Sequence, residues 1–131
     1  AVRSKIGDAK GLQLMANQQK LFTHLKKQGW DIELGDMLQT DGVYHEKGVD
    51  VKIAVEMIRF AREDKYDYAY LLSSDTDLVP AVEEVRSFKK FVRYVGFPKG
   101  QSFGLTKASN NVLLLREEDV IPHFPKTLFE E

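Results

Sequence analysis

Hydrophobic residues in the first third of the chain recur with the spacing of a helix and then with that of a strand. Residues 12–30 carry apolar side chains on one helical face, and Gly29 is typical of a helix end. Residues 30–38, WDIELGDML, alternate apolar and charged side chains, which predicts a strand near a sheet edge. Residues 40–48, TDGVYHEKG, predict a polar loop.

Residues 49–64, VDVKIAVEMIRFARED, have the clearest helical pattern in the chain. Ile53, Ala54 and Met57 repeat at helical spacing. Asp50 falls on the same stripe, so we expect it in the first turn, on the inward side. An acid at this position is also favoured by the helix dipole, whatever its function.

Strand and helix patterns alternate through the rest of the sequence. We predict strands at residues 66–74 and 91–97, helices at 78–90 and 104–111, and a short strand or extended tail at 117–124. This alternation predicts the α/β class, with a mainly parallel sheet and helices on both faces.

The composition excludes several functions. The 131 residues suit one domain, and they include no cysteine, so thiolate metal sites and cysteine nucleophiles are excluded. No apolar run approaches the ~20 residues of a membrane span. We therefore expect a single cytoplasmic domain over residues 1–131, without a membrane partner.

Charge is unevenly distributed, although the net charge is only −1. No acid occurs between Glu84 and Glu117, and the residues between them are locally basic. Two interpretations stay open: a solvated face balanced by the acidic half of the chain, or a surface that binds phosphates. The second places nucleic-acid contacts on Lys89, Lys90, Arg93, Lys99 and Lys107.

Two carboxylates, Asp75 and Asp77, follow the predicted strand 66–74 in the sequence SSDTD. Parallel α/β sheets bind ligands at the carboxyl ends of their strands, and the first turn that carries Asp50 is expected to face the same edge. Oxygen ligands without cysteine suit Mg²⁺ or Mn²⁺. Structural roles compete with this interpretation, because Asp77 can cap a helix and Asp50 suits the helix dipole. Asp75 has no such ready explanation.

Two blocks of the sequence resemble the NYN domain, a branch of the PIN-like nucleases. They are KGVDVKIAVEM from Lys47 and YLLSSDTDLVPAVEEVRSFKKFVRYVGF from Tyr70, and they match the family's K-G-x-D and S-x-D-x-D patterns in order and spacing. The resemblance implies a PIN-like, Rossmann-like sandwich that cleaves single-stranded or structured RNA with Mg²⁺ or Mn²⁺. It implies that Asp50, Asp75 and Asp77 are the catalytic and metal-binding acids.

The sequence departs from the family pattern at two places. Members usually open with a hydrophobic strand that ends D-x-x-N, and residues 1–14 supply no such strand; Asp8 is a poor substitute. We therefore expect a native segment before Ala1 that adds a strand beside residues 66–74 and brings a further metal-binding aspartate. Where the family tends to have an aspartate before its last apolar segment, this chain has Asn110, which implies a weaker metal site.

Three functions follow from these features. The first is a metal-dependent ribonuclease. The second is a catalytically weak nuclease-fold domain that binds RNA or a protein as a regulatory module, which Asn110 favours. The third, a phosphoryl-transfer or phosphatase domain, needs a lysine and hydroxyl set that the sequence does not place. A homodimer is left open, and the RNA sequence and the pathway cannot be read from the chain.

Overall fold

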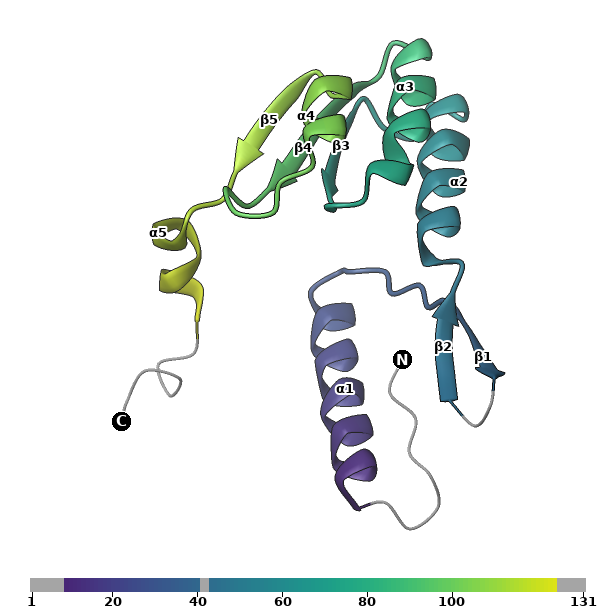
Figure 1. Ribbon diagram of the computed structural model, residues 1–131, viewed down its shortest axis with the longest axis vertical. Helices are drawn as coiled ribbons and strands as arrows, with labels where there is room; N and C mark the ends of the chain where they lie inside the picture. The colour runs from purple at the N-terminus through teal and green to yellow at the C-terminus, as the bar shows by residue number, and fades with distance from the viewer. Residues whose placement is uncertain (1–8, 41–42, 125–131) are drawn as a thin grey trace. The chain divides into compact units, whose positions relative to one another are not determined.

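The computed structural model describes residues 9–40 and 43–124 and divides the chain into two compact units (Figure 1). The first unit is Ala1–Lys52 and the second is Ile53–Glu131. The boundary falls inside helix α2, Val49–Arg62. The single domain expected over residues 1–131 stays a prediction.

The first unit contains a helix and a hairpin. Helix α1, Ala9–Lys27, confirms the predicted N-terminal helix. Its end is closed by Gly29, which takes a φ of +88°, while the Trp30 N–H donates to the Leu25 carbonyl at 3.1 Å. Strands β1, Asp36–Thr40, and β2, Val43–Lys47, then pair antiparallel.

The hairpin corrects two predictions made from the sequence. The strand begins at Asp36 and not at Trp30, and the predicted polar loop 40–48 contains strand β2. Gly35 explains the later start, because a Cβ there would lie 2.7 Å from a Val49 methyl group and 2.8 Å from the Lys47 carbonyl oxygen. The chain can therefore pass this close to the end of β2 only at a glycine.

The second unit is built on a parallel sheet, which confirms the predicted α/β class. The strands lie in the order β3-β4-β5, and both neighbouring pairs are parallel. Besides α2, the elements are β3 (Tyr68–Leu72), the 3₁₀ turn η1 (Thr76–Leu78), α3 (Val79–Ser87), β4 (Phe91–Gly96), α4 (Phe103–Ala108), β5 (Asn111–Leu114), α5 (Glu117–Val120) and η2 (Ile121–His123).

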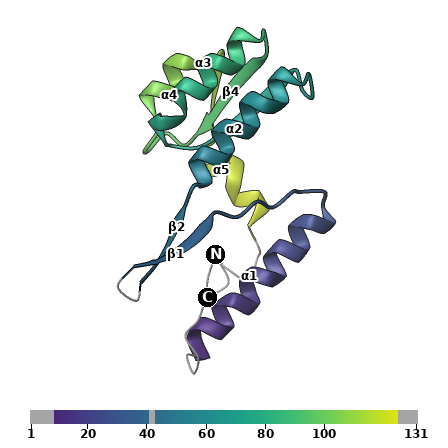
Figure 2. The ribbon, with the colours of Figure 1, turned by 90° about the vertical axis from the view of Figure 1, so that its right-hand side faces the viewer.

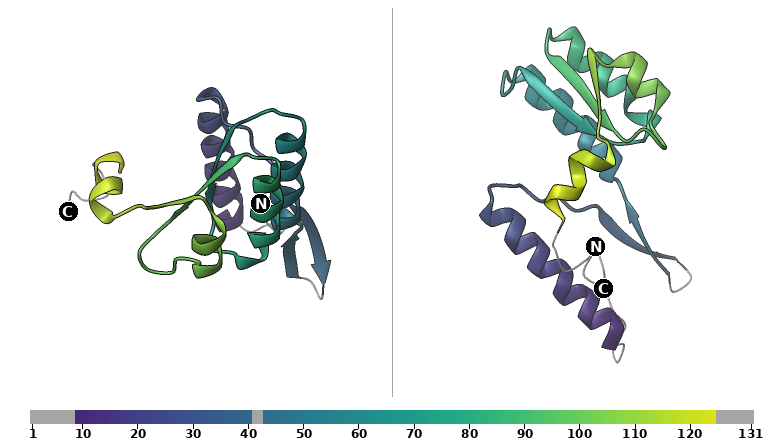
Figure 3. Two further views of the ribbon diagram at one scale, coloured as in Figure 1. Left: turned by 90° about the horizontal axis from the view of Figure 1, so that it is seen from above. Right: turned by 90° about the vertical axis from the view of Figure 1, so that its left-hand side faces the viewer.

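The core of this unit lies on one face of the sheet. Leu71, Val92 and Tyr94 point into it, and helices α2, α3 and α4 together with Leu78 of η1 supply the other buried side chains. Helices α3 and α4 lie side by side, as Figures 2 and 3 show. On the opposite face Tyr68 and Tyr70 remain 66% and 64% exposed, because alternate residues of a strand point to opposite sides.

The C-terminal segment 117–124 is helical, so the predicted strand or extended tail is wrong. The Arg116 N–H donates to the Asp119 carboxylate at 2.8 Å, and the Asp119 N–H donates to the Arg116 carbonyl at 3.0 Å, so the two residues close the start of α5. Three acids in the first turn add a favourable interaction with the helix dipole. Among residues 9–40 and 43–124, no helix combines the length and apolarity needed to cross a membrane.

Candidate functional site at the carboxyl edge of the sheet

Asp75 and Asp77 lie just beyond the carboxyl end of β3, as the sequence predicts. The Asp75 N–H donates to the Ser73 hydroxyl at 3.1 Å, and the Asp75 Oδ1 accepts from the Asp77 N–H at 2.9 Å. Asp75 is therefore the N-cap of η1, whereas the sequence favoured Asp77 as a cap. Helix α3 has Leu78 at its N-cap position, without a side-chain cap. The structural role thus belongs to Asp75.

The capping bond occupies one oxygen of the Asp75 carboxylate. Asp75 is half-buried, and its side chain makes no other hydrogen bond or ion pair within the part of the chain that the structure describes. The Asp77 carboxylate is exposed and makes no hydrogen bond or ion pair with the described residues. Several carboxylate oxygens at this edge are therefore available to an oxygen-seeking cation.

The loop that carries both acids is held from two sides. Leu78 at the end of η1 is fully buried in the core of the second unit. Thr76 lies against helix α4 at Gly104, where a Cβ would come within 3.0 Å of the Thr76 methyl group. Pro80 falls in the first turn of α3, where its missing N–H costs no helical bond.

A cavity of about 170 Å³ opens between the ends of β3 and β4, and its lining includes Ser74, the residue before Asp75. Leu72, Ser73 and Ser74 line it from β3 and the residues after it. Its other walls come from β4 and the following loop, including Phe97 and Lys99. Ser74 directly precedes Asp75, so the cavity and the acidic loop are continuous in the chain.

The far wall of the cavity is fixed by a buried tyrosine. The Tyr94 hydroxyl accepts a hydrogen bond from the Ser102 N–H at 2.9 Å, and the Ser102 hydroxyl caps α4 by accepting from the Leu105 N–H. Gly96 makes room for this hydroxyl, because a Cβ there would lie 2.5 Å from it. No pattern in the sequence indicates this bond.

Asp50 occupies the first turn of α2, as predicted. It is exposed, whereas the stripe to which the sequence assigns it continues inward through Ile53, Ala54 and Met57, which pack against the core. Asp50 belongs to the first unit and the other two acids to the second. No group of three metal-ligating side chains is assembled within residues 9–40 and 43–124. A site shared by Asp50, Asp75 and Asp77 stays a prediction.

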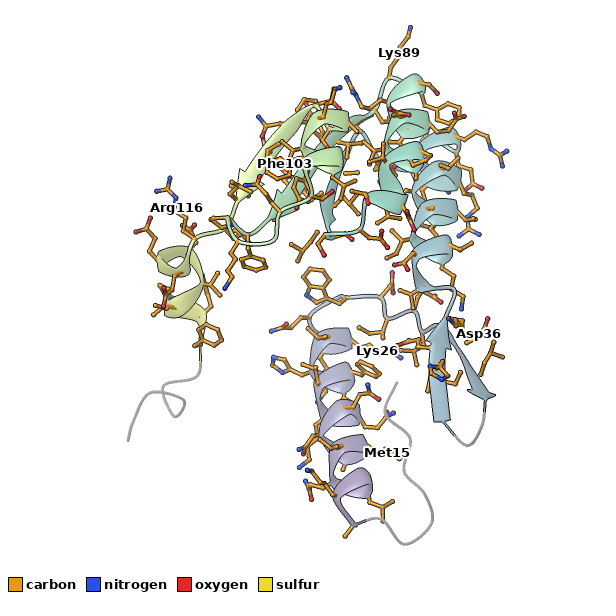
Figure 4. The ribbon with its side chains drawn as sticks, in the orientation of Figure 1. Met15, Lys26, Asp36, Lys89, Phe103 and Arg116 are labelled. Carbon is orange, nitrogen blue, oxygen red and sulfur yellow. The ribbon has the colours of Figure 1, made fainter. Side chains whose placement is uncertain are left out.

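Two of the predicted basic contacts lie at the opposite, amino edge of the sheet. Lys89 and Lys90 precede β4 and line a cavity of about 360 Å³ with Arg86. Figure 4 shows the Lys89 side chain extending beyond the end of α3. Lys90 is paired with Asp64 and Asp67, and these hydrogen bonds raise the Lys90 pKa and lower that of Asp64.

The remaining three basic residues are dispersed. Arg93 lies in the middle of β4 with its guanidinium 5.5 Å from the centre of the Tyr70 ring. Lys107 lines a further cavity, of about 300 Å³, beside α3 and α4. Of the five, only Lys99 lines the cavity beside Asp75. The predicted RNA contacts stay predictions, but these side chains do not form one continuous patch.

Asn110 does not lie near the acids. Its Oδ1 accepts from the Val92 N–H at 2.9 Å, and its own N–H donates to the Val92 carbonyl at 2.9 Å, so it extends the pairing of β4 with β5. Because Asn110 precedes β5 while Asp75 follows β3, and the strands are parallel, the two lie at opposite ends of strands about 17 Å long. Asn110 therefore has no place in a metal site with Asp75.

The parallel sheet flanked by helices, with acids at the carboxyl end of one strand, places the second unit in the α/β class. The NYN domain matches residues 4–115, and the chain belongs to the NYN domain family, within the PIN-like nuclease superfamily. NYN domains generally bind RNA, and PIN-like nucleases generally use divalent metals.

One solved structure is similar to this chain. It is the crystal structure of a protein of unknown function from Vibrio parahaemolyticus, which is 25% identical with a TM-score of 0.67. The match covers 90% of this chain and 67% of that one. No curated protein matches the chain in sequence.

Proposed function

We propose that this protein is a metal-dependent ribonuclease that hydrolyses phosphodiester bonds of RNA. The observation that supports the proposal is that both acids at the end of β3 keep carboxylate oxygens available for a metal ion. Asp75 is held in place by its capping bond and keeps one carboxylate oxygen free, and Asp77 is exposed without a side-chain partner among the described residues. Such oxygens fit Mg²⁺ or Mn²⁺.

Asp50, Asp75 and Asp77 would hold the metal ion. Within the second unit, the part of helix α2 from Ile53 onward precedes β3 and runs antiparallel to it (Figure 1). Asp50 lies one turn before Ile53, the first residue of α2 that packs on the core. The ion would supply Lewis-acid activation of water and neutralise charge on the phosphate.

The assay is cleavage of a single-stranded RNA with Mg²⁺ or Mn²⁺, with and without chelator. Asp77→Asn keeps the size of the side chain and removes its charge, and we expect a rate loss of about 100-fold. Glu63→Gln, an exposed acid beyond the end of α2 without a side-chain partner in the described structure, is the matched control. Equal rates for wild type, Asp77→Asn and a chelated sample would contradict the proposal.

The proposal includes RNA contacts from Lys89, Lys90, Arg93, Lys99 and Lys107. Lys90 is a poor test residue, because its ion pairs with Asp64 and Asp67 make any substitution structural as well. Lys89→Ala is a better test of a phosphate contact. If Lys89 contacts a phosphate, this variant should lower the slope of log affinity against log salt by about 0.7 for single-stranded RNA.

The alternative function, a weak nuclease-fold module that only binds RNA or protein, rested on Asn110. That reason no longer supports it, because the Asn110 side chain is bonded to the Val92 N–H at the other edge of the sheet. RNA binding without any metal-dependent cleavage would still favour the alternative.

A further inference from the structure

The cavity beside Asp75 has the size and the lining residues of a ligand site. The proposed metal ion does not use this cavity. Its volume is about 170 Å³. The side chains of Leu72, Val95 and Phe97 give it apolar walls, and Ser73 and Ser74 add hydroxyl groups that can donate and accept hydrogen bonds. Such a mixture of apolar walls and few polar groups is typical of small-molecule sites.

We propose that this cavity receives one unpaired nucleobase of the RNA, next to the phosphate that is cleaved. The inference rests on the proposed function and specifies its substrate as RNA with an unstacked base at this position. Phe97, which is 49% exposed, would stack on the base, and the hydroxyls of Ser73 and Ser74 would bind its polar edge.

The position of the cavity favours RNA over a neutral small molecule. Ser74 is followed directly by Asp75, so a base in the cavity has its own phosphate close to the acidic loop. Lys99 lines the same cavity and has no ion-pair or side-chain hydrogen-bond partner in the described part of the chain. Its ammonium group can therefore neutralise the backbone phosphate that accompanies the base.

The cavity is preformed, which lowers the cost of binding. Tyr94 is fully buried and its hydroxyl holds Ser102 at the end of the loop that carries Phe97 and Lys99. The other wall is held by the bond from the Asp75 N–H to the Ser73 hydroxyl. A base within a duplex is stacked and paired and cannot enter, so the cavity selects unpaired RNA.

The test is titration of the full chain with nucleoside 5′-monophosphates in chelator, followed by NMR shifts of backbone amides. Ribose 5-phosphate is titrated in parallel, because it carries the same phosphate without a base. We expect saturable binding of at least one nucleotide, with the largest shifts at Gly96 and Gly100, which line the cavity. Ribose 5-phosphate should bind at least tenfold more weakly, because it lacks the stacking ring.

Matched variants then assign the contacts. Phe97→Ala should weaken nucleotide binding by about tenfold, whereas Phe103→Ala should leave it unchanged; Phe103 is 79% exposed on α4 and does not line the cavity (Figure 4). Lys99→Ala should weaken binding by a smaller factor that shrinks in high salt. Lys65→Ala, which changes an exposed lysine before β3, should have no effect.

Two results would overturn the inference: no saturable binding of any of the four nucleotides, or equal effects of Phe97→Ala and Phe103→Ala. Equal binding of ribose 5-phosphate and nucleotides would equally reject a base pocket. These outcomes are independent of catalysis, because chelator is present throughout. Failure of the ribonuclease proposal would instead show as absent metal-dependent cleavage with nucleotide binding intact.

Discussion

The two edges of the parallel sheet in the second unit differ in the side chains that surround their cavities. The carboxyl edge has Asp75 and Asp77 beside a small cavity, and the amino edge has Arg86 and Lys89 beside a larger one. The chain crosses the sheet with every strand, so residues close in sequence alternate between the edges. The run of basic residues is therefore divided between the two edges, with Arg86, Lys89 and Lys90 around the amino-edge cavity and Lys99 at the carboxyl-edge cavity.

The edges also differ in how they are held together. At the carboxyl edge, the fully buried Tyr94 hydroxyl accepts from a buried backbone N–H of Ser102. Near the amino edge, the half-buried Tyr66 hydroxyl donates to the Met57 carbonyl at 2.7 Å, and burial raises the Tyr66 pKa. The carboxyl edge is thus fixed by a bond with no access to water, which suits a preformed site.

The largest effect is expected at the carboxyl edge, from Asp75→Asn. The asparagine Oδ1 can still accept from the Asp77 N–H, so the loop keeps its cap while the site loses one charge. We expect RNA cleavage to fall by about 100-fold, or ~2.7 kcal/mol of transition-state stabilisation, with unchanged thermal stability.

Asp75→Ala separates the two roles of this residue. This variant removes the charge and the cap together. Its cleavage rate should therefore fall as far as that of Asp75→Asn, and its free energy of unfolding should also fall by about 1 kcal/mol. A variant Asp75→Asn that cleaves RNA at the wild-type rate would show that Asp75 is only a cap.

Removing the two tyrosine hydroxyls compares the edges directly. Tyr94→Phe leaves the buried Ser102 N–H without an acceptor, which should cost about 1–3 kcal/mol of unfolding free energy. Tyr66→Phe should cost less, about 0.5–1.5 kcal/mol, because the Met57 carbonyl lies inside helix α2 and its environment is wetter. Urea denaturation of both variants measures the difference, and equal losses would contradict it.

The Lys90 cluster should make the amino edge sensitive to acid. The hydrogen bond from Lys90 holds the Asp64 pKa below its ordinary value of 3.8. A carboxyl group whose pKa is lowered by folding stabilises the folded state at any pH above its ordinary pKa. This stabilisation disappears as the pH falls through the lowered pKa. Lys90→Met should therefore melt at a lower temperature than wild type at pH 7, and the gap should close in acid. A gap independent of pH would instead indicate lost packing of the Lys90 stem.

The smallest effect is expected from Asn110→Asp, which restores the residue type typical of the family. The new carboxylate can still accept from the Val92 N–H, but it lies at the edge away from Asp75. Neither the cleavage rate nor the metal affinity should change. A rise in Mn²⁺ affinity, measured by calorimetry, would show that the two edges share a site after all.

Much of the second unit could be predicted from the sequence. The apolar runs before Ser73 and around Val92 predict β3 and β4. Among the described strands, full burial is reached only in the middle strand β4, whereas β3 is an edge strand with Tyr68 and Tyr70 exposed on one face. Strand Val43–Lys47 was not predicted, because it is defined by its backbone pairing with strand β1 and not by its own residue pattern. Helix α5 was missed because its signal is the run of acids in its first turn, with Asp119 bonded to the Arg116 N–H, and not a hydrophobic pattern.

The sequence by itself determined the α/β class, the helix that begins near Asp50 and the placement of Asp75 and Asp77 after a strand. These features depend on local periodicity and turn chemistry, which neighbouring residues settle. Only the tertiary structure decided that Asn110 lies at the other edge and that Lys90 is held by Asp64 and Asp67. The edge and the partner of a residue depend on which distant strands pair, and no local pattern in one sequence encodes that pairing.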